Sequence, residues 1–313
     1  MKRTWILALL ACAAAAAAAD YKQAVAYYKQ GRYDRAIQEL KPDLDANPDW
    51  EFGHRLMGLC YLNLKNNALA IASLTRAVQL KSTVFATYQG LAQANYNIGR
   101  FENCIQALDE GARYAKEPSD QYYLHYLRGS AYYRLEKFQE AAAELTEAVR
   151  LRPGDWTSLS QLGICYYNLE RQDEAVEALQ KALTLKPGHN VTAEFLGKAY
   201  FRKGVAALSA KRYPEAIDWF QKARDYMPDN GYVHYNIAEA LLFQGKYPEA
   251  EKALNQALTL MPRSAEVFQR LGLVYEKQKK WDLAVNAYQK ADEINPLPSL
   301  KEAIKRVNEL RKR

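Results

Sequence analysis

The chain has 313 residues, of which 49% are hydrophobic and 25% charged, and its net charge is +7 at pH 7. Lys2 and Arg3 supply two of these charges, and residues 301–313 hold six basic and two acidic side chains, so the remaining chain is almost neutral. Since a protein that binds nucleic acid needs a basic stripe along its binding surface, the composition argues against a nucleic-acid partner.

Residues 1–19 have the pattern of an export signal. Two basic residues precede an apolar stretch from Trp5 to Leu10 and an alanine tract. Cleavage after Ala19 is expected to release the chain into an export compartment, so that it is periplasmic or secreted. Alternatively, the segment Leu9-Leu10-Ala11-Cys12 resembles a bacterial lipoprotein box, which would make Cys12 a lipidated residue and the chain a membrane-anchored lipoprotein. The apolar stretch is too short for a transmembrane helix, so this anchor is the only expected membrane contact.

A small residue recurs along the rest of the chain at intervals of 34 residues, interrupted by one interval of 37 and one of 41. These marker residues are Ala36, Ala70, Cys104, Ala141, Ala175, Ala216, Ala250 and Ala284. Twelve residues before each marker stands Gly or Ala, and four residues after it stands Leu, Phe or Tyr. Small residues let two helix axes approach to about 8–10 Å, and a large apolar residue fills the seam. Each repeat is therefore predicted to be a tight helical hairpin, with the marker in its second helix.

The repeat resembles the tetratricopeptide repeat (TPR) family in several local segments. Leu-Gly-Ile-Cys-Tyr-Tyr begins at Leu162, Asp-Glu-Ala begins at Asp173, and Pro187 closes that repeat. The resemblance covers residues 20–296 and implies an all-α fold. This fold is an α-solenoid in which eight helix–turn–helix units wind into a right-handed superhelix, with their first helices on the inner face.

Three segments depart from the regular repeat. The three extra residues before the fourth marker are expected to widen a surface loop at residues 116–120. The seven extra residues of the 41-residue interval add two helical turns, so we expect one long helix from about Val191 to Ala210, which either bends the superhelix or simply extends the helix. Residues 297–313 predict a C-terminal capping helix that starts with a capping box of Ser299 and Glu302 and ends in a basic tail.

The sequence contains none of the familiar catalytic or nucleotide-binding motifs, so we expect neither an enzyme nor a cofactor. Three histidines occupy the same column of different repeats, which separates them by about 20 Å or more and leaves no metal site. These histidines are His54, His125 and His234. The cysteines of the array, Cys60, Cys104 and Cys165, occupy positions where other repeats have small residues, so they are predicted to be buried free thiols.

The inner face of the first helices is the predicted site for a partner protein. In the second to fifth repeats this face combines tyrosine rings with amides, which can contact an extended peptide of any sequence. From the sixth repeat the face becomes apolar, which suits an amphipathic helix. The predicted partner-binding residues are Asn63, Gln93, Tyr96, Asn97, Tyr126, Tyr133, Arg134, Tyr167 and Asn168, followed by Phe201, Leu208, Tyr235 and Phe243. The competing interpretation is that the tyrosines only pack between neighbouring helices.

Taken with the resemblance to exported bacterial envelope TPR proteins, the sequence predicts a non-enzymatic protein–protein interaction scaffold in the cell envelope. Its concave groove would bind an extended or helical segment of a partner protein, and by analogy it would support the assembly of envelope complexes. The alternative is a protein that binds cell-wall glycan (peptidoglycan) through exposed groove tyrosines.

Overall fold

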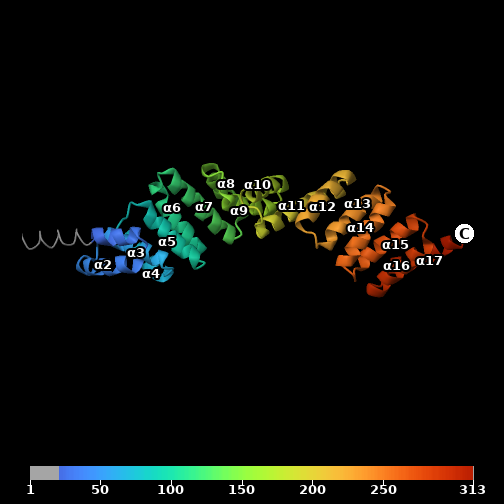
Figure 1. Ribbon diagram of the computed structural model, residues 1–313, viewed down its shortest axis with the longest axis horizontal. Helices are drawn as coiled ribbons and strands as arrows, with labels where there is room; N and C mark the ends of the chain where they lie inside the picture. Colours follow the sequence, from blue (N-terminus) through green and yellow to red (C-terminus); the bar gives the residue numbers. More distant parts are fainter. Residues whose placement is uncertain (1–20, 313) are drawn as a thin grey trace, which may run out of the picture. The chain divides into compact units, whose positions relative to one another are not determined.

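The computed structural model describes residues 21–312, and every regular element in that range is a helix (Figure 1). The predicted export signal, with Cys12, lies outside the described residues. Residues 21–29 are helical. The helices that follow are α2 (Tyr33–Ala46), α3 (Glu51–Asn63), α4 (Asn67–Gln79), α5 (Phe85–Asn97), α6 (Phe101–Gly111), the 3-10 helix η1 (Ala112–Tyr114), α7 (Pro118–Arg134), α8 (Phe138–Leu151), α9 (Trp156–Asn168), α10 (Gln172–Leu185), α11 (Asn190–Ser209), α12 (Tyr213–Tyr226), α13 (Gly231–Phe243), α14 (Tyr247–Leu260), α15 (Ala265–Lys277), α16 (Trp281–Ile294) and α17 (Pro298–Arg311). No helix of the described range is both long and apolar enough to cross a membrane.

The described part of the chain divides into two compact units, residues 21–165 and residues 166–312. Within the first unit α3 pairs with α4, α5 with α6 and α7 with α8, and the first helices α3, α5 and α7 also contact one another in order. Within the second unit α11 pairs with α12, α13 with α14 and α15 with α16, and α11 also contacts α13. The predicted all-α solenoid class of stacked helical hairpins is thereby confirmed, and in each unit the first helices share one face.

The small residue twelve positions before the marker meets the large residue four positions after it, as predicted. A Cβ atom added to Gly204 would lie 2.5 Å from the Phe220 ring, and one added to Gly272 would lie 2.6 Å from the Tyr288 ring. Gly58 and Gly129 stand in the same relation to Leu74 and Leu145, at 2.6 and 2.8 Å. These distances are too short for any side chain, so the glycines allow the two helices of a hairpin to touch.

The turn inside each hairpin has one repeated geometry. The residue five positions before each marker has a positive φ, between 57° and 77° in all eight hairpins. These residues are Gly31, Lys65, Gly99, Glu136, Glu170, Lys211, Gly245 and Lys279. The chain therefore enters the left-handed region even where it has no glycine, because the packed hairpin imposes the turn.

Two local predictions are corrected by the structure. The extra residues before the fourth marker do not widen a loop at residues 116–120, because α7 begins at Pro118, the first helical position, where the fixed φ of proline favours a helix start. The predicted capping box of Ser299 and Glu302 is also wrong. Pro298 starts α17, so Leu297 is the N-cap residue and no side chain caps this helix.

Two other local predictions are confirmed. The long helix α11 runs without interruption from Asn190 to Ser209, within one residue of the predicted ends. Cys60, Cys104 and Cys165 are fully buried free thiols, and burial raises the pKa of each to about 12.

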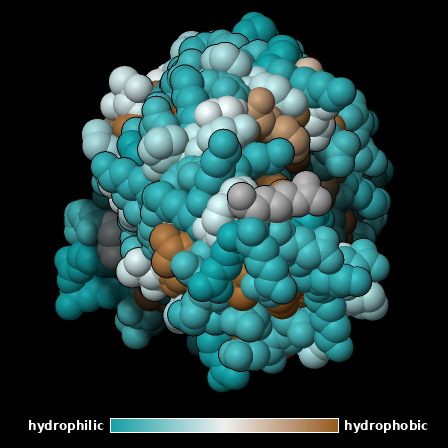
Figure 2. All heavy atoms as spheres, turned by 90° about the vertical axis from the view of Figure 1, so that its right-hand side faces the viewer, coloured by the Kyte–Doolittle hydropathy of each residue, from teal (hydrophilic) through white to brown (hydrophobic). Residues whose placement is uncertain are grey.

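The C-terminal helix α17 covers the apolar side of the last hairpin. Its buried residues Leu300, Ala303 and Val307 pack in one cluster with Tyr288 and Ala291 of α16. The surface at this end of the molecule is mostly hydrophilic, with separate hydrophobic spots (Figure 2).

Candidate protein-binding face

The predicted partner-binding residues lie on both units, and the residues of each unit form a separate set. Seven belong to the first unit, from Asn63 to Arg134, and six to the second, from Tyr167 to Phe243. None of the thirteen side chains is buried, and five are exposed: Asn63, Asn97, Arg134, Asn168 and Phe243.

Amide side chains form a connected row on the first unit. Gln93 donates a hydrogen bond from Nε2 to Oδ1 of Asn97 at 2.8 Å, and Asn97 donates from Nδ2 to Oδ1 of Asn67 at 3.0 Å. Asn63 donates to the carbonyl of Leu59 in its own helix at 2.8 Å. An amide has two N–H donors and room for two hydrogen bonds at its oxygen, so Asn97 keeps one of each for a partner.

The tyrosine rings of the first unit each pack on another ring. Tyr96 meets Phe101 edge-on at 5.4 Å between centroids, Tyr133 meets Phe138 at 6.1 Å, and Tyr126 stacks on Tyr122 at 5.7 Å. Burial raises the pKa of Tyr96 and Tyr133. Packing between helices therefore covers part of each ring, and the rest of the ring surface stays accessible.

Arg134 joins this face at the end of α7. Its guanidinium lies 4.9 Å from the centre of the Phe101 ring, and it opposes the rise that burial causes in the pKa of Tyr96. The side chain is exposed. It places a cation beside the amide row, where it can pair with a carboxylate of a partner.

The second unit offers a different surface. Phe243 is 58% exposed and stacks on Tyr213 at 5.3 Å, whereas Phe201 packs against Phe220 at 5.5 Å. Tyr235 accepts a hydrogen bond from Nε of Arg270 at 3.3 Å. Phe201 and Phe243 make this surface more apolar than the amide row of the first unit.

Tyr167 is contacted by two side chains of α11, Phe195 and Arg202. Its ring meets Phe195 edge-on at 5.3 Å, and the Arg202 guanidinium lies 3.9 Å from the ring centre. Arg202 also donates to the Tyr167 carbonyl at 2.9 Å. Here the competing interpretation of helix packing fits better than a free binding surface.

Sequence reasoning missed the residues that support the face. Asn67, Phe101 and Tyr213 belong to second helices, three residues before their markers, and each contacts a predicted residue. This position is aromatic in six of the eight repeats. This recurring aromatic position could have indicated the supporting residues, because it lies across the hairpin turn from the inner face of the first helix.

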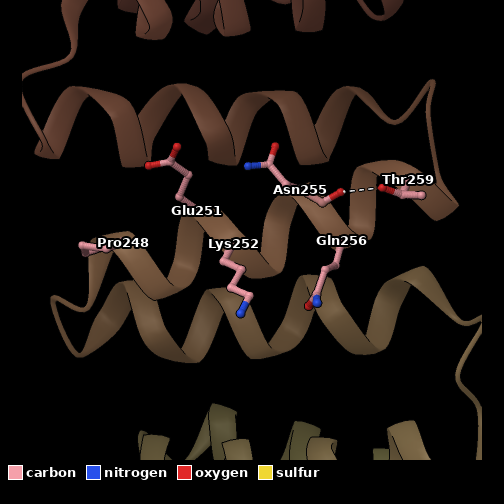
Figure 3. A pocket seen from close by; sticks show the side chains of 6 residues that line it. All are labelled: Pro248, Glu251, Lys252, Asn255, Gln256 and Thr259. Atoms are coloured by element: carbon pink, nitrogen blue, oxygen red, sulfur yellow. Dashed lines mark hydrogen bonds between the residues drawn. The ribbon is translucent and has the colours of Figure 1, made fainter.

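Shallow pockets also occur on second helices. One on α14 is lined by Pro248, Glu251, Lys252, Asn255, Gln256 and Thr259 (Figure 3). Its side chains point to both sides of the helix rather than toward one another, and Thr259 donates a hydrogen bond to the Asn255 carbonyl at 3.0 Å. We assign no ligand to this pocket.

The three histidines of the repeat each have a local environment. His54 hydrogen bonds to the Pro48 carbonyl at 2.9 Å, His125 lies 2.8 Å from Glu144, and His234 is buried. Across the described residues there is no group of three His, Cys, Asp or Glu side chains that could hold a metal ion.

Stacked helical hairpins whose first helices share a partly open face define a helical repeat protein of the interaction class. Family models described as "Tetratricopeptide repeat" match residues 21–84, 126–190, 207–269 and 265–296. The chain belongs to the tetratricopeptide repeat family. Proteins of this family generally mediate protein–protein interactions and act as scaffolds, and most have no enzymatic activity.

The similar proteins have varied names. The BBSome complex member BBS4 from Bos taurus is 28% identical over 287 residues, which is 90% of this chain and 53% of that protein. Protein O-mannosyl-transferase TMTC1 from Homo sapiens is 29% identical over 93 residues, 30% of this chain and 10% of that protein. The photosystem I assembly protein Ycf3 from Prochlorococcus marinus is 30% identical over 82 residues, 25% of this chain and 47% of that protein. The chain thus spans about half or less of the length of these relatives.

A similar solved structure is the C-terminal part of a TPR repeat-containing protein from Cytophaga hutchinsonii. It is 16% identical, with a TM-score of 0.51, over 91% of this chain and 99% of that chain. At this identity the similarity shows the fold alone.

Proposed function

We propose that this protein is a non-enzymatic scaffold that binds a segment of a partner protein on its first helices. The observation that carries the proposal is the row of linked amides on the first unit, with Asn63 and Asn97 exposed beside half-open tyrosine rings. Such a surface offers hydrogen bonds to an extended backbone and flat contact area to its side chains, whatever the sequence.

The first-helix face of the second unit binds, in this proposal, an apolar side of its partner. Phe243, Val205 and Leu208 leave apolar surface accessible, and the Phe243 ring is held in place by Tyr213. An amphipathic helix would place its apolar stripe on these residues.

The proposed setting is an export compartment of the cell envelope. The support is the pattern of residues 1–19, read either as a cleaved signal or as a lipoprotein signal ending before Cys12. The names of BBS4 and Ycf3 refer to membership in a complex and to assembly of one. By analogy, we propose that this scaffold supports the assembly of an envelope complex.

The test is capture of partners from an envelope extract by the purified protein and by variants of each face. In the first unit the variant is Asn97→Ala with Arg134→Ala, and in the second it is Phe243→Ala. All three side chains are exposed, so the fold should persist while capture through that face falls by roughly tenfold or more. The matched control is Gln106→Ala with Asn255→Ala, two side chains of second helices.

Two results would contradict the proposal. One is equal capture by the face variants and the control, with unchanged helical circular dichroism. The other is sedimentation of the wild-type protein with purified peptidoglycan, lost in the Tyr133→Ala variant, because that outcome would favour the glycan-binding alternative.

A further inference from the structure

A basic residue opens the second helix of almost every hairpin. It stands four residues before the marker, at the N-cap position, and its side chain makes no capping hydrogen bond. These turn cations are Arg32, Arg100, Lys137, Arg171, Arg212, Lys246 and Lys280, and all are exposed. The second repeat instead has Asn66 at this position, whose Oδ1 accepts a hydrogen bond from the Leu69 amide at 3.3 Å.

Helix capping does not explain this choice of residue. Asn, Asp and Ser are favoured at the N-cap because they accept a hydrogen bond from the first turn, and a cation there is repelled by the positive end of the helix dipole. Seven turns therefore give up a stabilising contact that Asn66 makes. A residue type that is unfavourable at its position, and whose cost no neighbouring contact offsets, is expected to recur where the surface has a function.

Local ion pairs offset part of the repulsion between the turn cation and the helix dipole only in the second unit. There Arg171 pairs with Glu174 at 2.8 Å and Arg212 with Glu215 at 2.9 Å. In the described part of the first unit, Arg32, Arg100 and Lys137 form no ion pair, although Arg32 lies 4.9 Å from the Tyr27 ring centre. The first unit therefore presents turn cations without carboxylate partners.

Aliphatic side chains accompany the cations on the same edge of the first unit. Leu64 and Ile98 are the C-cap residues that follow α3 and α5 and are 38% and 43% exposed, and Leu69 on α4 is 45% exposed. The two turns are neighbours, because α3 packs on α5 and Asn97 hydrogen bonds to Asn67.

Acidic residues are unevenly distributed around these turns. Residues 52–101 contain no Asp or Glu, although they hold five Lys or Arg residues. The acidic residues at this edge are Asp34, Glu102, Glu136 and Glu140, each in a turn or first helical turn that also holds a turn cation. The turn of Leu64 and Lys65 has no acidic residue.

We infer that the turn edge of the first unit, defined by Arg32, Leu64, Ile98, Arg100 and Lys137, docks on an anionic lipid surface. The aliphatic side chains enter the boundary between headgroups and acyl chains, and the cations contact lipid phosphates. An acidic protein or a nucleic acid would use the cations but would leave Leu64 and Ile98 in water. This contact is peripheral, and its turns adjoin the amide row of the proposed function, since Leu64 follows Asn63 and Ile98 follows Asn97.

The experiment is sedimentation of the full chain with vesicles at low ionic strength. The vesicles are phosphatidylcholine alone or phosphatidylcholine with about 30% phosphatidylglycerol. The test variant is Arg32→Asn with Arg100→Asn and Lys137→Asn. Each lost cation should cost about a factor of five, so partition onto the anionic vesicles should fall by roughly 100-fold. Thermal stability should rise, because asparagine is a better N-cap than a cation.

The matched control removes the same charge elsewhere on the first unit, through Lys22→Asn, Lys41→Asn and Lys116→Asn, and should lose much less binding. A second variant, Leu64→Ser with Ile98→Ser, should weaken binding while the charge is unchanged. The inference fails if the wild type does not bind anionic vesicles, if it binds neutral vesicles equally well, or if test and control variants lose the same amount. It also fails if Leu64→Ser with Ile98→Ser leaves binding intact while polyglutamate competes for it, since the edge would then bind acidic protein.

Discussion

At the scale of the residue, the hairpin turn shows how the fold constrains single positions. Gly99 has φ of 77° and Gly154 does not have a positive φ, yet an added Cβ would meet no atom within 4 Å at either position. The two glycines therefore differ in backbone conformation and not in the space around them. Any difference between their alanine variants reports the left-handed backbone alone.

We predict that Gly99→Ala lowers the free energy of unfolding by about 1 kcal/mol, because alanine is strained in the left-handed region. Gly154→Ala should be neutral or slightly stabilising, since it only reduces the entropy of the unfolded chain. Urea unfolding followed by circular dichroism compares the two. Equal effects would mean that the turn tolerates alanine as readily as an ordinary loop does.

At the scale of the element, the packing of two helices depends on matched pairs of residues. The aromatic side chains Phe220 and Tyr288 both face glycine, in Gly204 and Gly272. In three other repeats the residue twelve before the marker is alanine, and the large partner is leucine: Ala24 with Leu40, Ala92 with Leu108 and Ala238 with Leu254. An aromatic ring at this seam thus requires glycine, whereas leucine accepts alanine.

Gly204→Ala should destabilise the second unit by roughly 1–3 kcal/mol, because the new methyl group would lie 2.5 Å from the Phe220 ring and α11 must move away from α12. Combining it with Phe220→Leu restores the pair found in other repeats. A double-mutant cycle measured by thermal unfolding should then show a favourable coupling between the two substitutions. Simple additivity would show that the two positions do not share a seam.

At the scale of the whole molecule, the three buried thiols provide probes of opening. Cys60, Cys104 and Cys165 belong to α3, α6 and α9, and burial raises the pKa of each thiol to about 12. At pH 8 only roughly one such thiol in ten thousand is ionised, and reagent cannot reach it without opening of the hairpin.

A chain carrying Cys12→Ser should therefore react with Ellman's reagent about a thousandfold more slowly when native than in denaturant. Raising the pH within the stable range should speed the native reaction, since it increases the thiolate fraction. Mass spectrometry of partially labelled protein identifies which hairpin opens first. Rapid labelling of all three native thiols would contradict the buried environment.

The candidate face was only partly predictable from the sequence. Spacing along a helix placed Asn97, Tyr133 and Phe243 on accessible positions, because side-chain direction follows from local geometry. The cover over Tyr167 depends on Arg202, which is 35 residues away in sequence, and no spacing rule within one helix could have indicated it.

The sequence by itself determined the repeat, the helical hairpins, their small and large packing columns, the long helix α11 and the burial of the cysteines. These features depend on periodicity and residue size, which are local properties that recur in every copy. Only the tertiary structure decided which rings stay open, where α7 and α17 begin, and which hydrogen-bond capacity the amides keep. Those outcomes depend on contacts between separate helices. The repeat period does not specify which side chains of neighbouring helices make these contacts.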